Sequence, residues 1–112
     1  MKFIINEFTK KRGEPAMLAL SCTRCNEIVL LYQKDGPGPL LRCYFDRIHA
    51  PKSFMNLQKK KDYPKTLLCP SCKTLLGTTA IYEKENRLAF FLEETSLHSL
   101  FVEPCFWDQF LY

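Results

Sequence analysis

Two cysteine pairs with the same spacing constrain this chain more than any other feature. They are Cys22-Thr-Arg-Cys25 and Cys69-Pro-Ser-Cys72. A C-x-x-C turn directs both thiolates at one ion, and two such turns complete a tetrahedral, all-thiolate site for Zn²⁺. Four protein ligands fill the coordination sphere and leave no position for a reacting water. The pattern therefore predicts one structural, non-catalytic zinc ion.

The gap between the pairs is long, because 43 residues separate Cys25 from Cys69. A compact zinc ribbon has roughly 15–20 residues there. A longer gap is compatible with one site if the two turns face each other across a sheet. The competing interpretation is reduced thiols or a dithiol redox pair. A thioredoxin-like motif needs one C-x-x-C in a βαβ context, and the sequence has neither a parallel-sheet pattern nor a reason for two copies.

Length and composition predict a single zinc-binding domain over residues 1–112. Hydrophobic residues make up 46% and charged residues 25%, which argues against general disorder. No apolar run approaches the roughly 18 residues of a membrane span, and the apolar stretch 3–5 is too short for a signal peptide. We therefore expect a cytoplasmic protein whose thiols stay reduced. Leaderless export and a secreted six-cysteine disulfide framework are the alternatives.

Segments rich in apolar and β-branched residues predict a mainly β fold of antiparallel hairpins, with a small α+β fold as the alternative. Apolar residues lead into each cysteine pair and strands follow, so each half is expected to supply one hairpin and two ligands. Alternation over 41–46 places Cys43 inward as a core residue. Asn86 suits a left-handed turn between the last two strands. The expected strands cover 3–8, 27–33, 41–46, 78–83 and 87–93.

The segment Asp35-Gly36-Pro37-Gly38-Pro39 cannot continue a regular element, because its prolines lack N–H donors and its glycines favour unusual dihedrals. Strands 27–33 and 41–46 on either side of it are expected to form a hairpin-like unit. The loop itself is either a recognition loop or a rigid turn.

Residues 47–66 form a basic segment that we expect to be an exposed loop, with one helical turn around 53–58. Its lysines favour nucleic-acid binding as an alternative function, with Phe54 and Tyr63 as candidates for base stacking. The net charge of the whole chain, +4, is modest for such a role. The lysines are Lys52, Lys59, Lys60, Lys61 and Lys65.

Residues 95–112 are acidic and aromatic. Their aromatic side chains either close the core of a small domain or form a surface for a protein partner. The first interpretation is the usual one in a domain of this size. The side chains concerned are Phe101, Phe106, Trp107, Phe110 and Tyr112.

The run Cys72-Lys73-Thr74-Leu75-Leu76-Gly77 resembles the C-x-x-C-x-x-x-L-G signature of the β-tent group. That group includes Yippee-like proteins, the thalidomide-binding domain of cereblon and zinc-containing methionine sulfoxide reductases of the B type. The resemblance implies antiparallel sheets that meet at a zinc ion. It also implies that the four paired cysteines are the ligands and that Leu76-Gly77 begins the following strand. An expanded zinc ribbon shares much of this pattern.

Departures from the group argue against its known activities. A B-type reductase would carry a late Arg/His-x-Cys-x-Asn stretch, whereas Cys105 has acidic neighbours that would raise its pKa. The cereblon-like domain uses several tryptophans, and this chain has one. His49 is expected to be solvated in a loop, and His98 to be a core or surface residue. We therefore predict a non-enzymatic module that binds a protein or another macromolecule, with a reductase-like enzyme as the less favoured reading.

Overall fold

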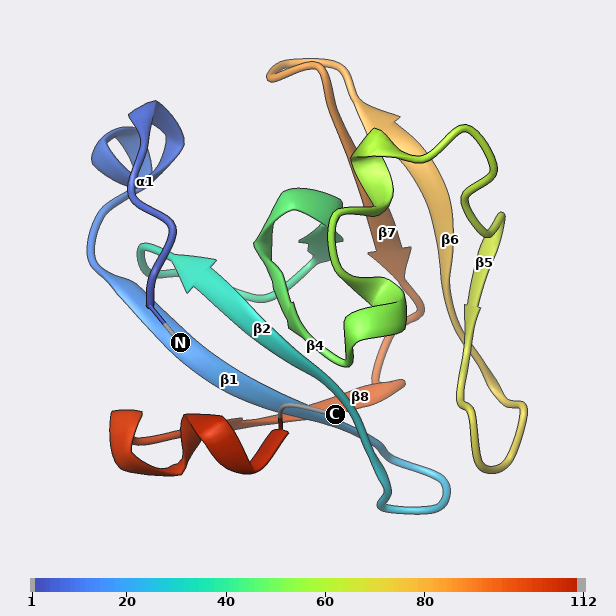
Figure 1. Cartoon of the computed structure of the whole chain (residues 1–112). Coiled ribbons are helices and arrows are strands. Elements are labelled where there is room, and N and C mark those ends of the chain that lie inside the picture. The colour runs from blue at the N-terminus through green and yellow to red at the C-terminus, as the bar shows by residue number, and fades with distance from the viewer. Residues whose placement is uncertain (1, 111–112) are drawn as a thin grey trace.

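The computed structural model describes residues 2–110, within which eight strands form two four-stranded antiparallel sheets (Figure 1). This arrangement confirms the prediction of a small β-rich fold. The first sheet has the order β4-β2-β1-β8, and its strands are β1 (Pro15–Cys22), β2 (Ile28–Asp35), β4 (Ile48–Ala50) and β8 (Leu97–Phe101). The second has the order β3-β7-β6-β5, and its strands are β3 (Arg42–Tyr44), β5 (Thr66–Leu68), β6 (Leu75–Tyr82) and β7 (Arg87–Leu92).

Two hairpins of the same design position the cysteines. β1 pairs with β2 in the first sheet, and β5 pairs with β6 in the second, each in antiparallel register. One cysteine pair lies at each connection, where Cys22 ends β1 and the other three cysteines follow a strand, and the two turns lie side by side at the lower right of Figure 1. The predicted repetition of strand, cysteine turn and strand is therefore present.

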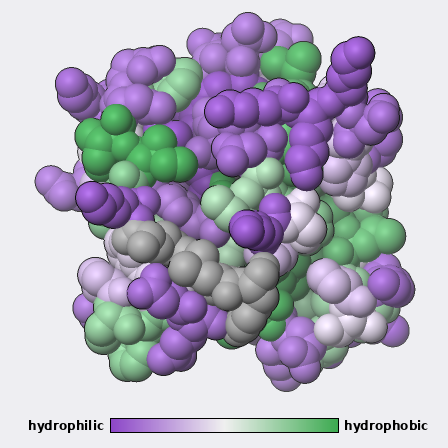
Figure 2. Space-filling view, viewed as in Figure 1, coloured by the Kyte–Doolittle hydropathy of each residue, from purple (hydrophilic) through white to green (hydrophobic). Residues whose placement is uncertain are grey.

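The main core lies between the two sheets. Leu20 and Leu30 of the first sheet pack in one cluster with Leu76 and Phe90 of the second. Cys43 is also fully buried in this cluster, as the alternation predicted. On the face shown in Figure 2, hydrophilic side chains dominate and separate smaller hydrophobic patches.

A second hydrophobic cluster covers the outer face of the first sheet. Met17, Leu31 and Ala50 form this cluster with Trp107, which lies in the 3-10 segment Pro104–Phe110. Trp107 is only 6% exposed, and its Nε1 donates to the Val102 carbonyl oxygen at 2.8 Å. One aromatic residue of the C-terminal segment thus belongs to the core.

The predicted opening strand over residues 3–8 is wrong, because residues Glu7–Arg12 form the helix α1. Asn6 begins this helix: its Oδ1 accepts from the Phe8 N–H at 3.0 Å, and its own N–H donates to Thr9 Oγ1 at 3.3 Å. This reciprocal capping favours a helical turn over extended backbone. No helix within residues 2–110 is long and apolar enough to cross a membrane.

The predicted hairpin between strands 27–33 and 41–46 is also wrong. β2 pairs with β1 and β4, whereas β3 pairs with β7 in the other sheet, where Cys43 lies opposite Phe90. The loop that begins at Gly36 therefore crosses from one sheet to the other. Gly36 is required there, because it has a φ of 80° and a Cβ would lie 2.1 Å from the Arg12 carbonyl oxygen.

The basic segment 47–66 is less exposed than predicted. Its start forms β4 beside β2, and Leu57 is buried in the main core with Phe54 and Tyr63 packed against it. Two 3-10 turns, Lys52–Phe54 and Leu57–Lys59, replace the single helical turn expected around 53–58. The five lysines remain exposed, but both stacking candidates are engaged in the core.

Candidate metal centre

The four paired cysteines converge where the two hairpin turns meet. Their Sγ atoms all lie within 4.8 Å of one another. Cys22 Sγ is 3.7 Å from Cys72 Sγ, and Cys25 Sγ is 3.5 Å from Cys69 Sγ. A tetrahedron with metal–sulfur bonds of about 2.3 Å has edges of about 3.8 Å. The four cysteines are thus positioned to bind one metal ion, with two ligands from each sheet.

The two cysteine turns have the same backbone conformation. The N–H of Asn26 donates to the Cys22 carbonyl oxygen at 2.8 Å, and the N–H of Lys73 donates to the Cys69 carbonyl oxygen at 2.9 Å. Asn26 and Lys73 have φ values of 66° and 63°, in the left-handed region. Asparagine tolerates this conformation well, and lysine adopts it at some cost. The same backbone turn therefore forms from two different sequences.

The thiols of the cluster differ in how readily they ionise. Hydrogen bonds from the side chain and backbone of Thr74 lower the pKa of Cys72 to about 6. A backbone hydrogen bond at Glu27 acts to lower the pKa of Cys25, but burial and the neighbouring sulfurs outweigh it and raise this pKa to about 12. Full ionisation of the cluster therefore needs a cation among the sulfurs, and binding of a metal would release protons.

The remaining cysteines and histidines lie on different elements. Cys43 on β3 is fully buried, and burial raises its pKa, whereas Cys105 is exposed in the segment Pro104–Phe110. His98 is exposed on β8. His49 is buried, which corrects the prediction of a solvated side chain, and its Nε2 lies 2.9 Å from Gln33 Oε1. Burial, helped by the nearby charge of Arg47, lowers the pKa of His49 to about 4.

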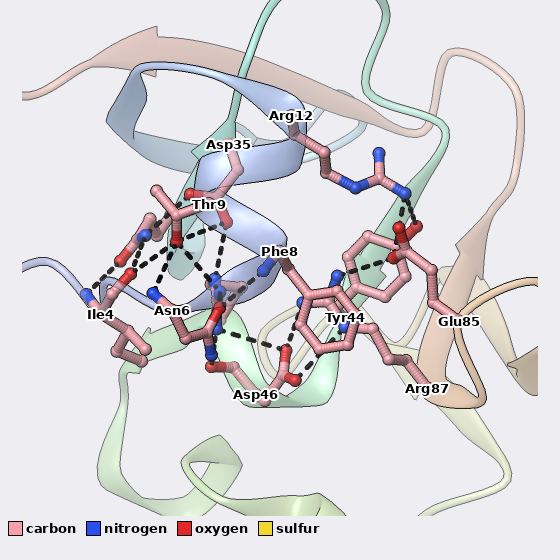
Figure 3. Close-up of polar contacts among 12 residues, drawn as sticks. Ile4, Asn6, Phe8, Thr9, Arg12, Asp35, Tyr44, Asp46, Glu85 and Arg87 are labelled. Atoms are coloured by element: carbon pink, nitrogen blue, oxygen red, sulfur yellow. Dashed lines mark hydrogen bonds and ion pairs between the residues drawn. The ribbon is translucent and has the colours of Figure 1, made fainter.

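A cluster of buried ion pairs was missed by the sequence analysis. It lies near α1, at the end of β2 that is remote from the cysteines (Figure 3). Arg47 is 1% exposed, and its Nε lies 2.9 Å from Asp35 Oδ2. Arg87 pairs with Asp46 at 2.6 Å and with Glu85 at 2.9 Å. The neighbouring opposite charges Asp46-Arg47 were a signal, but Arg47 was counted only as part of the basic segment 47–66.

Arg12 of α1 extends this cluster. Its Nη2 lies 3.1 Å from Glu85 Oε1 and donates to the Tyr44 hydroxyl at 2.8 Å. Burial acts to raise the pKa of Glu85, but hydrogen bonds from Arg87 and Arg12 outweigh it and hold this pKa below its usual value. The cluster thus joins α1 to both sheets through charges.

Comparisons with protein-family models, with curated proteins and with solved structures find no match for this chain. The sulfur cluster and the two sheets are therefore the basis for any statement about function. They establish a four-cysteine site within an antiparallel β fold.

Proposed function

We propose that the four cysteines hold one Zn²⁺ as a structural ion. Thiolates are soft ligands, and a closed tetrahedral set of four is typical of structural zinc sites. The ion would cross-link the β1–β2 turn of one sheet to the β5–β6 turn of the other. A β-tent is the finer architecture that we propose, because in it two antiparallel sheets meet at the metal. Reduced thiols of this kind fit a cytoplasmic location.

We further propose that the protein is a non-enzymatic module that binds a protein partner along β8. The observation that carries this proposal is an edge strand with exposed apolar side chains. β8 pairs only with β1 within the described residues, so its outer edge is available for another strand. Leu100 and Phe101 on this strand are 72% and 76% exposed. Large apolar side chains at a free edge are typical of binding surfaces.

The residues around β8 support a basic partner segment with an apolar side chain. Glu93 and Glu94 precede the strand and Glu103 follows it, while the sequence has no lysine or arginine after Arg87. A cavity of about 640 Å³ lies beside β8, between Phe101 and the loop that carries Pro37. An extended, basic segment with an apolar side chain for this cavity would match both features.

The metal proposal is tested by elemental analysis of protein purified without added metal. We expect one zinc per chain in the wild type and a large loss of zinc in the variant Cys72→Ser. The variant Cys105→Ser is the control, because this exposed cysteine lies outside the cluster. Wild-type protein that contains iron, or no metal, would contradict the zinc assignment.

The partner proposal is tested by selecting peptides from a displayed library against the zinc-loaded protein. We expect basic peptides that bind β8 and lose affinity for the double variant Leu100→Ser/Phe101→Ser. The variant Ile81→Ser is the control, because Ile81 is an exposed apolar residue on β6 of the other sheet. Selected peptides that bind all three proteins equally would place the surface elsewhere.

A further inference from the structure

A small cavity lies beside the ion-pair cluster, and no cysteine lines it. Its volume is about 60 Å³, several times the roughly 10–15 Å³ that one water requires. Arginines from four different segments line it: Arg12 from α1, Arg42 from β3, Arg47 from the following 3-10 turn and Arg87 from β7. Four arginines from different parts of the chain thus lie around one small space.

The charges around this cavity do not cancel. Lys34 also lines it, together with one carboxylate, Asp35. Asp46 and Glu85 do not line the cavity but pair with Arg87 and Arg12, so the five positive side chains of the lining have three carboxylates as partners. The excess of two positive charges equals the charge of a phosphate dianion. A site with this charge and size favours a small oxyanion over a neutral ligand.

Arg42 is the member of the group with unused capacity. Within residues 2–110, Arg42 forms no ion pair with a carboxylate: its Nη1 donates only to the Tyr44 hydroxyl, at 3.3 Å, and its buried Nε has no hydrogen-bond partner. Its guanidinium carbon lies 4.2 Å from the centroid of the Tyr82 ring, which holds the planar group in place. The buried Nε of Arg12 likewise has no partner. Two of the arginines that line the cavity therefore each carry one N–H group that the protein leaves without a partner.

We propose that this cavity binds a tetrahedral oxyanion, either inorganic phosphate or the phosphoryl group of a phosphate monoester. The planar fork of arginine suits phosphate oxygens, and donors from several directions suit a tetrahedral ion. The proposal gives a role to the loop Asp35–Pro39, whose prolines Pro37 and Pro39 form part of the cavity wall. It does not involve the cysteine cluster, and the loop with Pro37 and Pro39 separates this cavity from the one beside β8, because both prolines line each of them.

The test is calorimetric titration of zinc-loaded protein, free of excess zinc, with inorganic phosphate at constant ionic strength. We expect a dissociation constant of about 1 mM or lower. Arg42→Gln should weaken binding about tenfold or more, because it removes a charged donor without leaving a carboxylate unpaired. Arg42→Lys keeps the positive charge but not the planar fork of the guanidinium, so its affinity for phosphate should lie between those of the wild type and Arg42→Gln. Lys60→Gln is the matched control for the loss of one exposed positive charge.

Further arms identify the source of the phosphoryl group. If glycerol phosphate binds as tightly as inorganic phosphate, the ligand is the phosphoryl group of a phosphate monoester. If glycerol phosphate does not bind, the ligand is inorganic phosphate. Acetate at the same concentration should bind at least about tenfold more weakly. The proposal is overturned if the wild type does not bind phosphate or if Arg42→Gln binds phosphate as tightly as the wild type does. It is also overturned if Lys60→Gln weakens phosphate binding as much as Arg42→Gln does, or if acetate binds as tightly as phosphate. Thermal unfolding of each variant verifies that it is folded.

Discussion

Removal of the metal tests the architecture most directly, because the ion joins segments that are distant in sequence. The loop between Cys25 and Cys69 contains 43 residues. In the chain-entropy model, closing a loop of this length restricts the unfolded chain by about 4 kcal/mol. A typical domain is stable by only about 5–15 kcal/mol, so loss of this cross-link should remove a large part of the total. We expect the metal-free protein to unfold far more easily than the loaded protein.

Urea unfolding under reducing conditions measures this loss, and the fluorescence of Trp107, the single tryptophan, reports on the transition. With a denaturant dependence of about 2 kcal/mol per molar urea, a loss of about 4 kcal/mol lowers the midpoint by about 2 M. Cys72→Ser should lower it similarly, whereas Cys105→Ser should leave it unchanged. Equal midpoints for loaded and chelated protein would refute the reasoning, because the sulfurs would then not cross-link the sheets through an ion.

Three further predictions concern the core, a buried histidine and the lysines. Trp107→Ala should lower the free energy of unfolding by about 3–5 kcal/mol, and Phe106→Ala, at an exposed position, by less than about 1 kcal/mol, as measured by circular dichroism in urea. His49 has a pKa of about 4 in the folded protein and about 6.5 when unfolded, so stability present above pH 6.5 should be lost as pH falls toward 4. The loss should reach roughly 3 kcal/mol and be smaller in His49→Gln. If the exposed lysines bind nucleic acid, retention on single-stranded DNA should fall with salt and disappear in the triple variant Lys59→Ala/Lys60→Ala/Lys61→Ala; retention that ignores salt would end this alternative.

The sequence predicted those parts of the fold that depend on neighbours along the chain. Each cysteine turn lies between two strands that pair directly with each other. The strand after each turn was expected, and the apolar run before each turn, which was not assigned as a strand, is β1 or β5. The left-handed residue Asn86 and the inward position of Cys43 also followed from local patterns. These features depend on backbone conformation and side-chain alternation, which a single segment reveals.

The errors arose where a segment has a distant partner. β3 follows β2 after a short loop, yet it pairs with β7, and 42 residues lie between β3 and β7. Local alternation identifies a strand, but it does not choose among partners of similar apolar character. The loop from Gly36 to Leu41 was expected to reverse the chain within one sheet. Instead, it carries the chain from one sheet to the other.

Arg47 shows why the ion-pair cluster was not predicted. By composition it belongs to a basic, solvated segment, and a charged side chain is rarely buried without partners. Its partners come from elsewhere: Asp35 Oδ2 lies at 2.9 Å from its Nε, and Asn6 Oδ1 accepts from its Nη2 at 2.6 Å. Burial of Arg47 therefore depends on the capped helix start and on the end of β2 at once. Asp35→Asn should therefore destabilise the protein by several kcal/mol, because it leaves the buried charge of Arg47 without its carboxylate. Such a loss would show that Arg47 is buried because the fold fixes its partners, a condition that no local pattern can reveal.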